Sequence, residues 1–163
     1  MDKRPSIDLN AKRWKRLEDL VWSSAQRTPT AIAIDRPPAL GEVEEARQVI
    51  TYADLEGRAK SLALSLYKIL RSRVTRAQYS IGSEQVIAIA MKRDQIDSYI
   101  ALLSVLEAGA AYLILDESFP LLRAQEMIND AQVVAVICDE AAMQRWAAVT
   151  LEAELIAYSS LII

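Results

Sequence analysis

The sequence contains no histidine and only one cysteine, Cys138. Without an imidazole there is no Ser-His-Asp or Cys-His catalytic group, and most zinc sites are excluded as well. A single thiol cannot form an internal disulfide, and this cysteine usage is typical of a reducing compartment. Because Cys138 ends an apolar run, we expect a buried, inert thiol rather than a nucleophile.

Glycine is also scarce. The four glycines, at positions 41, 57, 82 and 109, are too dispersed for a Walker-type or dinucleotide-binding phosphate loop.

The net charge of −3 favours neither nucleic acid nor an anionic membrane surface as a partner. The 163 residues fit one domain, and a hydrophobic content of 52% is enough for a buried core.

Nothing in the sequence predicts export or membrane insertion. Residues 1–16 are polar and basic, and no long apolar run follows them, so this is not a secretory signal. Acidic residues such as Asp2 count against a mitochondrial presequence, and we expect a solvated tail. Residues 98–115 are largely apolar, but the pattern changes from helical to strand-like at Gly109, so we reject a transmembrane helix. A cytoplasmic protein is therefore expected.

Three short apolar runs occupy the middle of the chain, at residues 86–91, 111–115 and 133–138. None of them alternates with polar residues, which indicates strands buried on both faces, as in a parallel sheet covered by helices. The segments between the runs are long enough for crossover helices. The sequence therefore predicts an α/β fold with a mostly parallel central sheet and helices on both faces.

Upstream of this region, the pattern predicts a helix over residues 17–27, stopped by Pro29. A short strand at residues 31–34, ended by Asp35, and a second at 49–50 are expected to pair as a hairpin.

Thr51 to Asp54 form a capping-box pattern, in which the Thr51 hydroxyl accepts from the Asp54 amide and the Asp54 carboxylate reaches back to the Thr51 amide. A helix to about residue 71 is expected from one apolar face: Leu55, Ala59, Leu62, Ala63, Leu66, Ile69 and Leu70. Residues 71–84 are expected to be a polar loop. Its Arg71, Arg73 and Arg76 could meet a phosphate, although a solvated loop is the commoner explanation.

Helix ends can be placed after each central strand. Asp94 is expected to cap a helix over residues 95–108, and Gly109 to end it in the left-handed conformation. Pro120 suits the first turn of the next helix. The expected inner face of that helix is Leu121, Leu122, Met127, Ile128 and Ala131. Asp139 is expected to cap a helix through Trp146.

Asp94, Asp116 and Asp139 each follow one of the central strands. Carboxylates at the carboxyl ends of parallel strands often contact ligands. They also cap helices and loops, which is the commoner role of a lone aspartate. One interpretation is therefore a small nucleotide-binding α/β domain that uses these aspartates as ligand contacts.

Two motifs carry a family resemblance. Residues 50–55, Ile-Thr-Tyr-Ala-Asp-Leu, are similar to the L-T-Y-x-E-L motif that opens adenylate-forming enzymes. Residues 106–116 resemble the second motif of those enzymes, L-K-A-G-x-A-Y-V-P-L-D. Val86 to Arg93, and Phe119-Pro120 with Arg123, resemble the neighbouring segments. The similarity runs from about Leu17 to about Glu140. It is closest to nonribosomal peptide synthetase adenylation domains and to the related enzymes that conjugate β-alanine to amines.

The resemblance implies a division of the chain into a polar tail (1–16), a partial adenylation-domain N-terminal subdomain (17–146) and a weakly patterned end that looks cut short (147–163). It also implies an AMP-forming ligase that activates a carboxylate with ATP and Mg²⁺ and passes the acyl group to a phosphopantetheine or CoA thiol. The implied partners are the remainder of the adenylation domain or a carrier-protein domain.

The sequence departs from the family in two ways. Two prolines of the second motif and its exit are replaced by Ile114 and Glu117, so the turn there is expected to be altered. The phosphate loop and the later motifs have no counterpart, although residues 158–160 resemble the start of that loop. We therefore assign no catalytic, cofactor-binding or metal residue and expect the chain alone to be inactive. The alternative is a stand-alone, non-catalytic binding or regulatory domain on the same scaffold.

Overall fold

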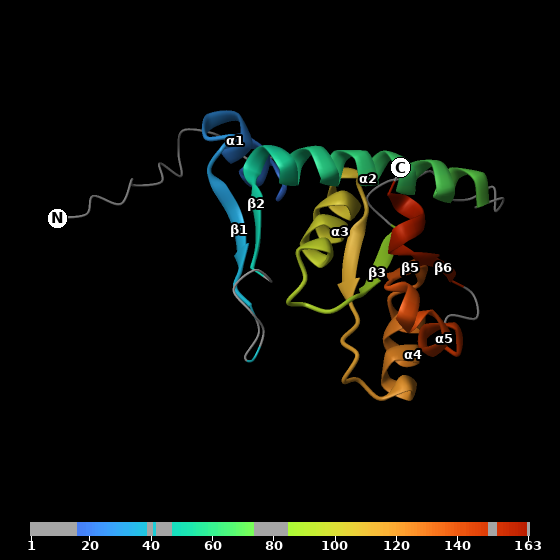
Figure 1. Ribbon diagram of the computed structural model, residues 1–163. Coiled ribbons are helices and arrows are strands. Elements are labelled where there is room, and N and C mark those ends of the chain that lie inside the picture. Colours follow the sequence, from blue (N-terminus) through green and yellow to red (C-terminus); the bar gives the residue numbers. More distant parts are fainter. Residues whose placement is uncertain (1–15, 39–40, 42–46, 74–84, 150–152, 163) are drawn as a thin grey trace.

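Residues 16–38, 41, 47–73, 85–149 and 153–162 are described by the computed structural model of the protein (Figure 1). Residues 1–15 of the predicted tail and residues 74–84 of the predicted loop, including Arg76, lie outside them. The elements in chain order are α1 (Asp19–Arg27), β1 (Ile32–Arg36), β2 (Gln48–Thr51), α2 (Tyr52–Arg73), β3 (Val86–Ala90), α3 (Ile96–Glu107), β4 (Ala111–Ile114), α4 (Leu121–Asp130), β5 (Val133–Cys138), η2 (Glu140–Ala142), α5 (Met143–Ala147), β6 (Glu154–Ala157) and η3 (Tyr158–Leu161).

The centre of the fold is a four-stranded sheet with the order β4-β3-β5-β6, in which every neighbouring pair is parallel. The three strands predicted from the apolar runs are confirmed to within one residue at each end. The fourth strand, β6, was missed, because its four residues alternate only weakly. It is placed by its pairing with β5, where Ile137 lies opposite Ile156.

Helices cover both faces of this sheet, as predicted. On one face, α2 and α3 pack against side chains such as Ile87, Ile89 and Ile137. On the other face, α4 and α5 pack against side chains such as Ala88 and Val136. Such two-sided cover is why these strands read as continuous apolar runs.

The β1–β2 hairpin forms a separate antiparallel sheet beside the main one (Figure 1). The predicted pairing is confirmed, but β1 continues through Asp35 and Arg36. Asp35 did not end the strand, because it pairs with Val49 and its carboxylate accepts two hydrogen bonds from Arg47, at 2.9 and 2.6 Å. The side-chain hydrogen bond from Arg47 holds the pKa of Asp35 below its ordinary value.

The long helix α2 reaches from the hairpin to η3 (Figure 1). Its predicted apolar face is confirmed where side chains are described: Leu55, Ala59, Leu62, Ala63 and Leu66 are buried. The helix continues to Arg73, so Arg71 and Arg73 belong to a helix and not to a loop.

The end of α3 is confirmed. Gly109 has φ of +83°, the amide of Gly109 donates to Leu106 O at 2.9 Å, and the amide of Ala110 donates to Val105 O at 3.1 Å. This pair of bonds is a Schellman motif, which requires the left-handed conformation at the glycine. It turns the chain directly into β4.

The inner face predicted for α4 is partly wrong. Ala124 and Ile128 are the buried side chains of this helix, whereas Leu122 is 70% exposed and Leu121 is 37% exposed. The buried stripe is narrower than predicted: Met127 and Ala131 pack against the apolar cluster that α4 joins, whereas Leu121 and Leu122 do not belong to it. In the part of the chain that the structure describes, no helix is long and apolar enough to cross a membrane.

Candidate functional site

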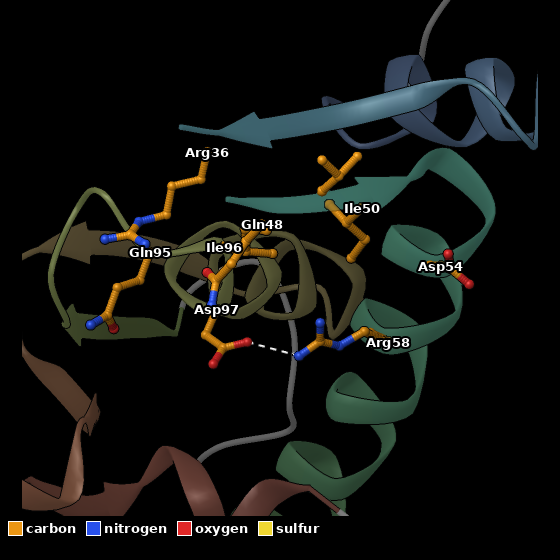
Figure 2. A pocket seen from close by; sticks show the side chains of 9 residues that line it. Arg36, Gln48, Ile50, Asp54, Arg58, Gln95, Ile96 and Asp97 are labelled. Atoms are coloured by element: carbon orange, nitrogen blue, oxygen red, sulfur yellow. Dashed lines mark hydrogen bonds and ion pairs between the residues drawn. The ribbon is translucent and has the colours of Figure 1, made fainter. Parts of the chain in front are cut away.

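A groove lies between the hairpin, the start of α2 and the start of α3, with a volume of about 640 Å³ (Figure 2). Its lining side chains come from all three elements: Arg36, Gln48, Val49, Ile50, Asp54, Arg58, Gln95, Ile96 and Asp97. Most of these side chains are charged or carry an amide, so the groove suits a polar ligand rather than an apolar one.

Ion pairs join the walls of the groove. A guanidinium nitrogen of Arg58 lies 2.8 Å from Asp97 Oδ1, which connects α2 to α3 (Figure 2). Arg36 on β1 lies 3.4 Å from Asp94 Oδ2, which connects the hairpin to the turn before α3. Both guanidinium groups therefore already have a carboxylate partner.

The capping box forms the start of α2 beside this groove. The Thr51 hydroxyl accepts from the Asp54 amide at 3.2 Å, as predicted. The Asp54 carboxylate accepts from the Thr51 hydroxyl at 2.7 Å rather than from the Thr51 amide. The Tyr52 amide donates to Ala31 O at 3.0 Å, which attaches the helix start to the segment before β1. The motif therefore has a positioning role at the junction of hairpin and helix.

The carboxyl edge of the main sheet is the second candidate region. The chain leaves β3 toward α3 on one face and leaves β5 toward α5 on the other face. The crevice between two such strands is the usual ligand position in open parallel sheets. Here the Lys92 amide after β3 donates to the carboxylate of Asp139 after β5. Burial raises the pKa of Asp139, and Asp97 and Glu117 add to the rise.

The three aspartates predicted at the strand ends have different structural roles. Asp94 does not cap α3: the N-cap residue is Gln95, and Asp94 pairs with Arg36 instead. Asp139 occupies the N-cap position of η2, but its side chain makes no capping hydrogen bond. The helix through Trp146 is thus a 3₁₀ turn followed by the short α5.

Asp116 orders the turn after β4. Its Oδ1 accepts from the Ser118 amide at 2.9 Å and from the Ser118 hydroxyl at 2.7 Å, and its Oδ2 lies 3.1 Å from Nε of Arg93. The hydrogen bonds from Ser118 hold the pKa of Asp116 below its ordinary value, with a smaller contribution from Arg93. Asp116 therefore acts as a turn-forming residue, and an alteration of this turn by Glu117 stays a prediction.

A side-chain network joins the groove to the end of β6. The Tyr158 hydroxyl donates to Asp97 Oδ1 at 3.1 Å, and Arg58 donates to the same oxygen. Burial raises the pKa of Tyr158, and the Asp97 carboxylate raises it further. Sequence reasoning missed this network, because Arg58 and Asp97 belong to no motif and meet only when α2 packs on α3.

Cys138 is fully buried, and burial raises the pKa of its thiol to about 11. The predicted burial of this thiol is confirmed, and its inertness stays a prediction. Among the described residues, no group of three or more acidic or cysteine side chains could hold a metal ion.

Comparison with known proteins gives a consistent result. Residues 21–160 match the family described as AMP-binding enzyme. The AMB antimetabolite synthetase AmbB of Pseudomonas aeruginosa is 32% identical over 132 residues, which are 81% of this chain and 9% of that protein. Malpinin synthetase of Mortierella alpina is 35% identical over 108 residues, which are 66% of this chain and 1% of that protein.

The fold is also found in a solved structure, the NpsA N-terminal subdomain of Klebsiella oxytoca. That structure has a TM-score of 0.71 and 19% identity, and the match covers 92% of this chain and 33% of that one. This likeness concerns the fold alone, and the chain spans only a small part of the synthetases it matches. The chain belongs to the AMP-binding enzyme family and has the fold of part of the N-terminal subdomain of a nonribosomal-peptide-synthetase-type adenylation domain.

Proposed function

We propose that this chain acts as part of the N-terminal subdomain of an adenylate-forming ligase. In the proposed reaction, a carboxylate oxygen attacks the α-phosphorus of ATP, a new O–P bond forms, and pyrophosphate leaves. A thiol then attacks the acyl carbon, and AMP leaves. The observation that carries this proposal is the family match over residues 21–160, which is supported by the parallel sheet and its helices.

The chain's own contribution is proposed to be structural. We propose that the described residues do not hold ATP–Mg²⁺ by themselves, and the carboxylate partners of both groove arginines support this proposal. Residues 1–163 alone are expected to be inactive, with ATP and Mg²⁺ held by other parts of the ligase.

The proposed partners follow from the same assignment. They are the remainder of an adenylation domain and a carrier-protein domain that bears the acceptor thiol. One structure with this fold, NpsA-ThdA, is an artificially fused adenylation-PCP di-domain from Klebsiella oxytoca, with a TM-score of 0.70 and 19% identity to this chain. A cytoplasmic location stays a prediction.

The size of the native polypeptide tests the proposal. An antibody raised against residues 1–163 would be used to recover the protein from its source, and its mass would be compared with 18.2 kDa. We expect a band far above that mass, as for a ligase that contains this region. A band at 18.2 kDa would support the alternative, a stand-alone binding or regulatory domain without chemistry.

A further inference from the structure

Tyr158 occupies a particular place in the fold. It is the first residue of η3, directly after β6, the edge strand of the parallel sheet. Its side chain is 6% exposed, and its hydroxyl donates to Asp97 Oδ1 at 3.1 Å. The buried phenol thus has a directional contact with the start of α3 in addition to apolar packing.

Asp97 is shared between two neighbours. The oxygen that accepts from Tyr158 also accepts from Arg58 at 2.8 Å. Arg58 and Asp97 line the groove, and their side chains are 50% and 41% exposed. Arg58 also interacts directly with the Tyr158 hydroxyl, and this contact lowers the pKa of the phenol against the larger raising effects of burial and Asp97. Asp97, Arg58 and Tyr158 therefore form one cluster, in which Asp97 and Arg58 line the groove.

We infer that Asp97 is a positioning residue that couples the groove to the segment after β6, by holding the Tyr158 hydroxyl on the same carboxylate oxygen that binds Arg58. A change at the groove that moves the Asp97 carboxylate also changes the hydrogen bond of Tyr158. The residues after β6 belong to the carboxyl edge of the sheet, where ligands of such sheets bind. The importance of that edge rests on the proposed function, whereas the coupling itself does not.

Spectroscopy can test this coupling on the full chain without any enzymatic activity. The protein would be labelled with 3-fluorotyrosine, and the Tyr158 fluorine resonance would be assigned through the Tyr158→Phe variant. Asp97→Asn and Arg58→Gln would then be compared with the wild type. The matched control is Asp54→Asn, which changes a carboxylate of the same groove that bonds to Thr51 instead of Tyr158.

We expect Asp97→Asn to shift the Tyr158 resonance and Asp54→Asn to leave it in place. Arg58→Gln should shift the resonance as well, both through Asp97 and through its own contact with the phenol, so the test rests on Asp97→Asn. Amide hydrogen exchange in residues 154–161 should rise about fivefold in Asp97→Asn and in Tyr158→Phe, the size expected for one net hydrogen bond. Because both substitutions remove the same contact, the double variant should exchange no faster than either single variant.

Two results would overturn the inference. One is a Tyr158 resonance that does not respond to Asp97→Asn, or that responds equally to Asp54→Asn. The other is an Asp97→Asn/Tyr158→Phe double variant in which the rise in amide exchange equals the two single-variant rises multiplied together. A failure here would leave the proposed ligase role untouched, because that role is tested by the size and activity of the native polypeptide.

Discussion

The indole Nε1 of Trp22 donates a hydrogen bond of 2.8 Å to Oε2 of Glu107 and thereby attaches α1 to the last turn of α3. Trp22 is 7% exposed and belongs to the core cluster between the helices and the sheet. Arg16 adds to the same junction, because its guanidinium donates to the backbone oxygens of Leu106 and Glu107. These contacts dock the N-terminal helix at the point where the chain turns into β4.

Replacing Trp22 with phenylalanine should therefore destabilise the protein by about 2 kcal/mol, because a charge-assisted hydrogen bond and part of the buried ring are lost. Urea unfolding measures the change. Glu107→Gln keeps an acceptor oxygen and should cost clearly less. Equal stability of wild type and Trp22→Phe would mean that α1 does not depend on this contact.

The turn after β4 should make stability depend on pH. Asp116 has a lowered pKa in the folded protein. Its ionised carboxylate therefore stabilises the fold fully at pH values above the ordinary aspartate pKa of 3.8, and this stabilisation is lost as the pH falls through the lowered pKa. Asp116→Asn should lower the urea midpoint at pH 7 and flatten the dependence of that midpoint on pH in the acid range. An unchanged acid limb in this variant would contradict the assignment.

Glu117 offers a second test of the same turn. It follows Asp116 in a β-turn closed by the bond from the Phe119 amide to Asp116 O at 3.0 Å, and proline is favoured at this position. Glu117→Pro should raise the urea midpoint. It should also reduce the decrease in that midpoint caused by Asp116→Asn, because proline would fix the turn without the side-chain contacts of Asp116. Glu117→Ala is the control and should not reduce that loss. Independent, additive effects of the proline and Asp116→Asn would contradict this explanation.

Two glycines provide a matched pair. An added Cβ would meet nothing within 4 Å at either Gly57 or Gly109, so only the backbone conformation differs between them. Gly57→Ala, in an exposed part of α2, should stabilise the protein by about 0.5–1 kcal/mol. Gly109→Ala should destabilise it by about 1 kcal/mol, because φ is +83° there. Thermal unfolding of the two variants should therefore shift in opposite directions, and a shift of the same sign would be inconsistent with the Schellman turn.

The central strands and their order of appearance could be predicted from the sequence, because burial on both faces leaves an unbroken apolar run. Gly109 could be predicted because glycine adopts the left-handed conformation at a helix end more readily than other residues. The signal of a single aspartate was less reliable. Asp94 has the right chemistry for a helix cap, but its carboxylate lies beside Arg36 from the hairpin, a contact that no local pattern contains.

The candidate site could not be predicted in the same way. The groove and the contacts of Asp97 depend on three elements that are distant in sequence, and Arg58, Asp97 and Tyr158 meet only through packing. The strand β6 was missed for a similar reason, because its place at the sheet edge is decided by its pairing with β5. Long-range packing, rather than local pattern, therefore decides where the polar contacts form.

The most direct test of the account is carboxylate-dependent exchange of labelled pyrophosphate into ATP. The native polypeptide, recovered with an antibody against residues 1–163, would be assayed with a panel of amino acids and aryl acids, beside residues 1–163 produced alone. We expect exchange with at least one carboxylate for the recovered polypeptide and none for residues 1–163. No exchange by the recovered polypeptide with any acid, in an assay where a known synthetase is active, would contradict the proposed ligase role.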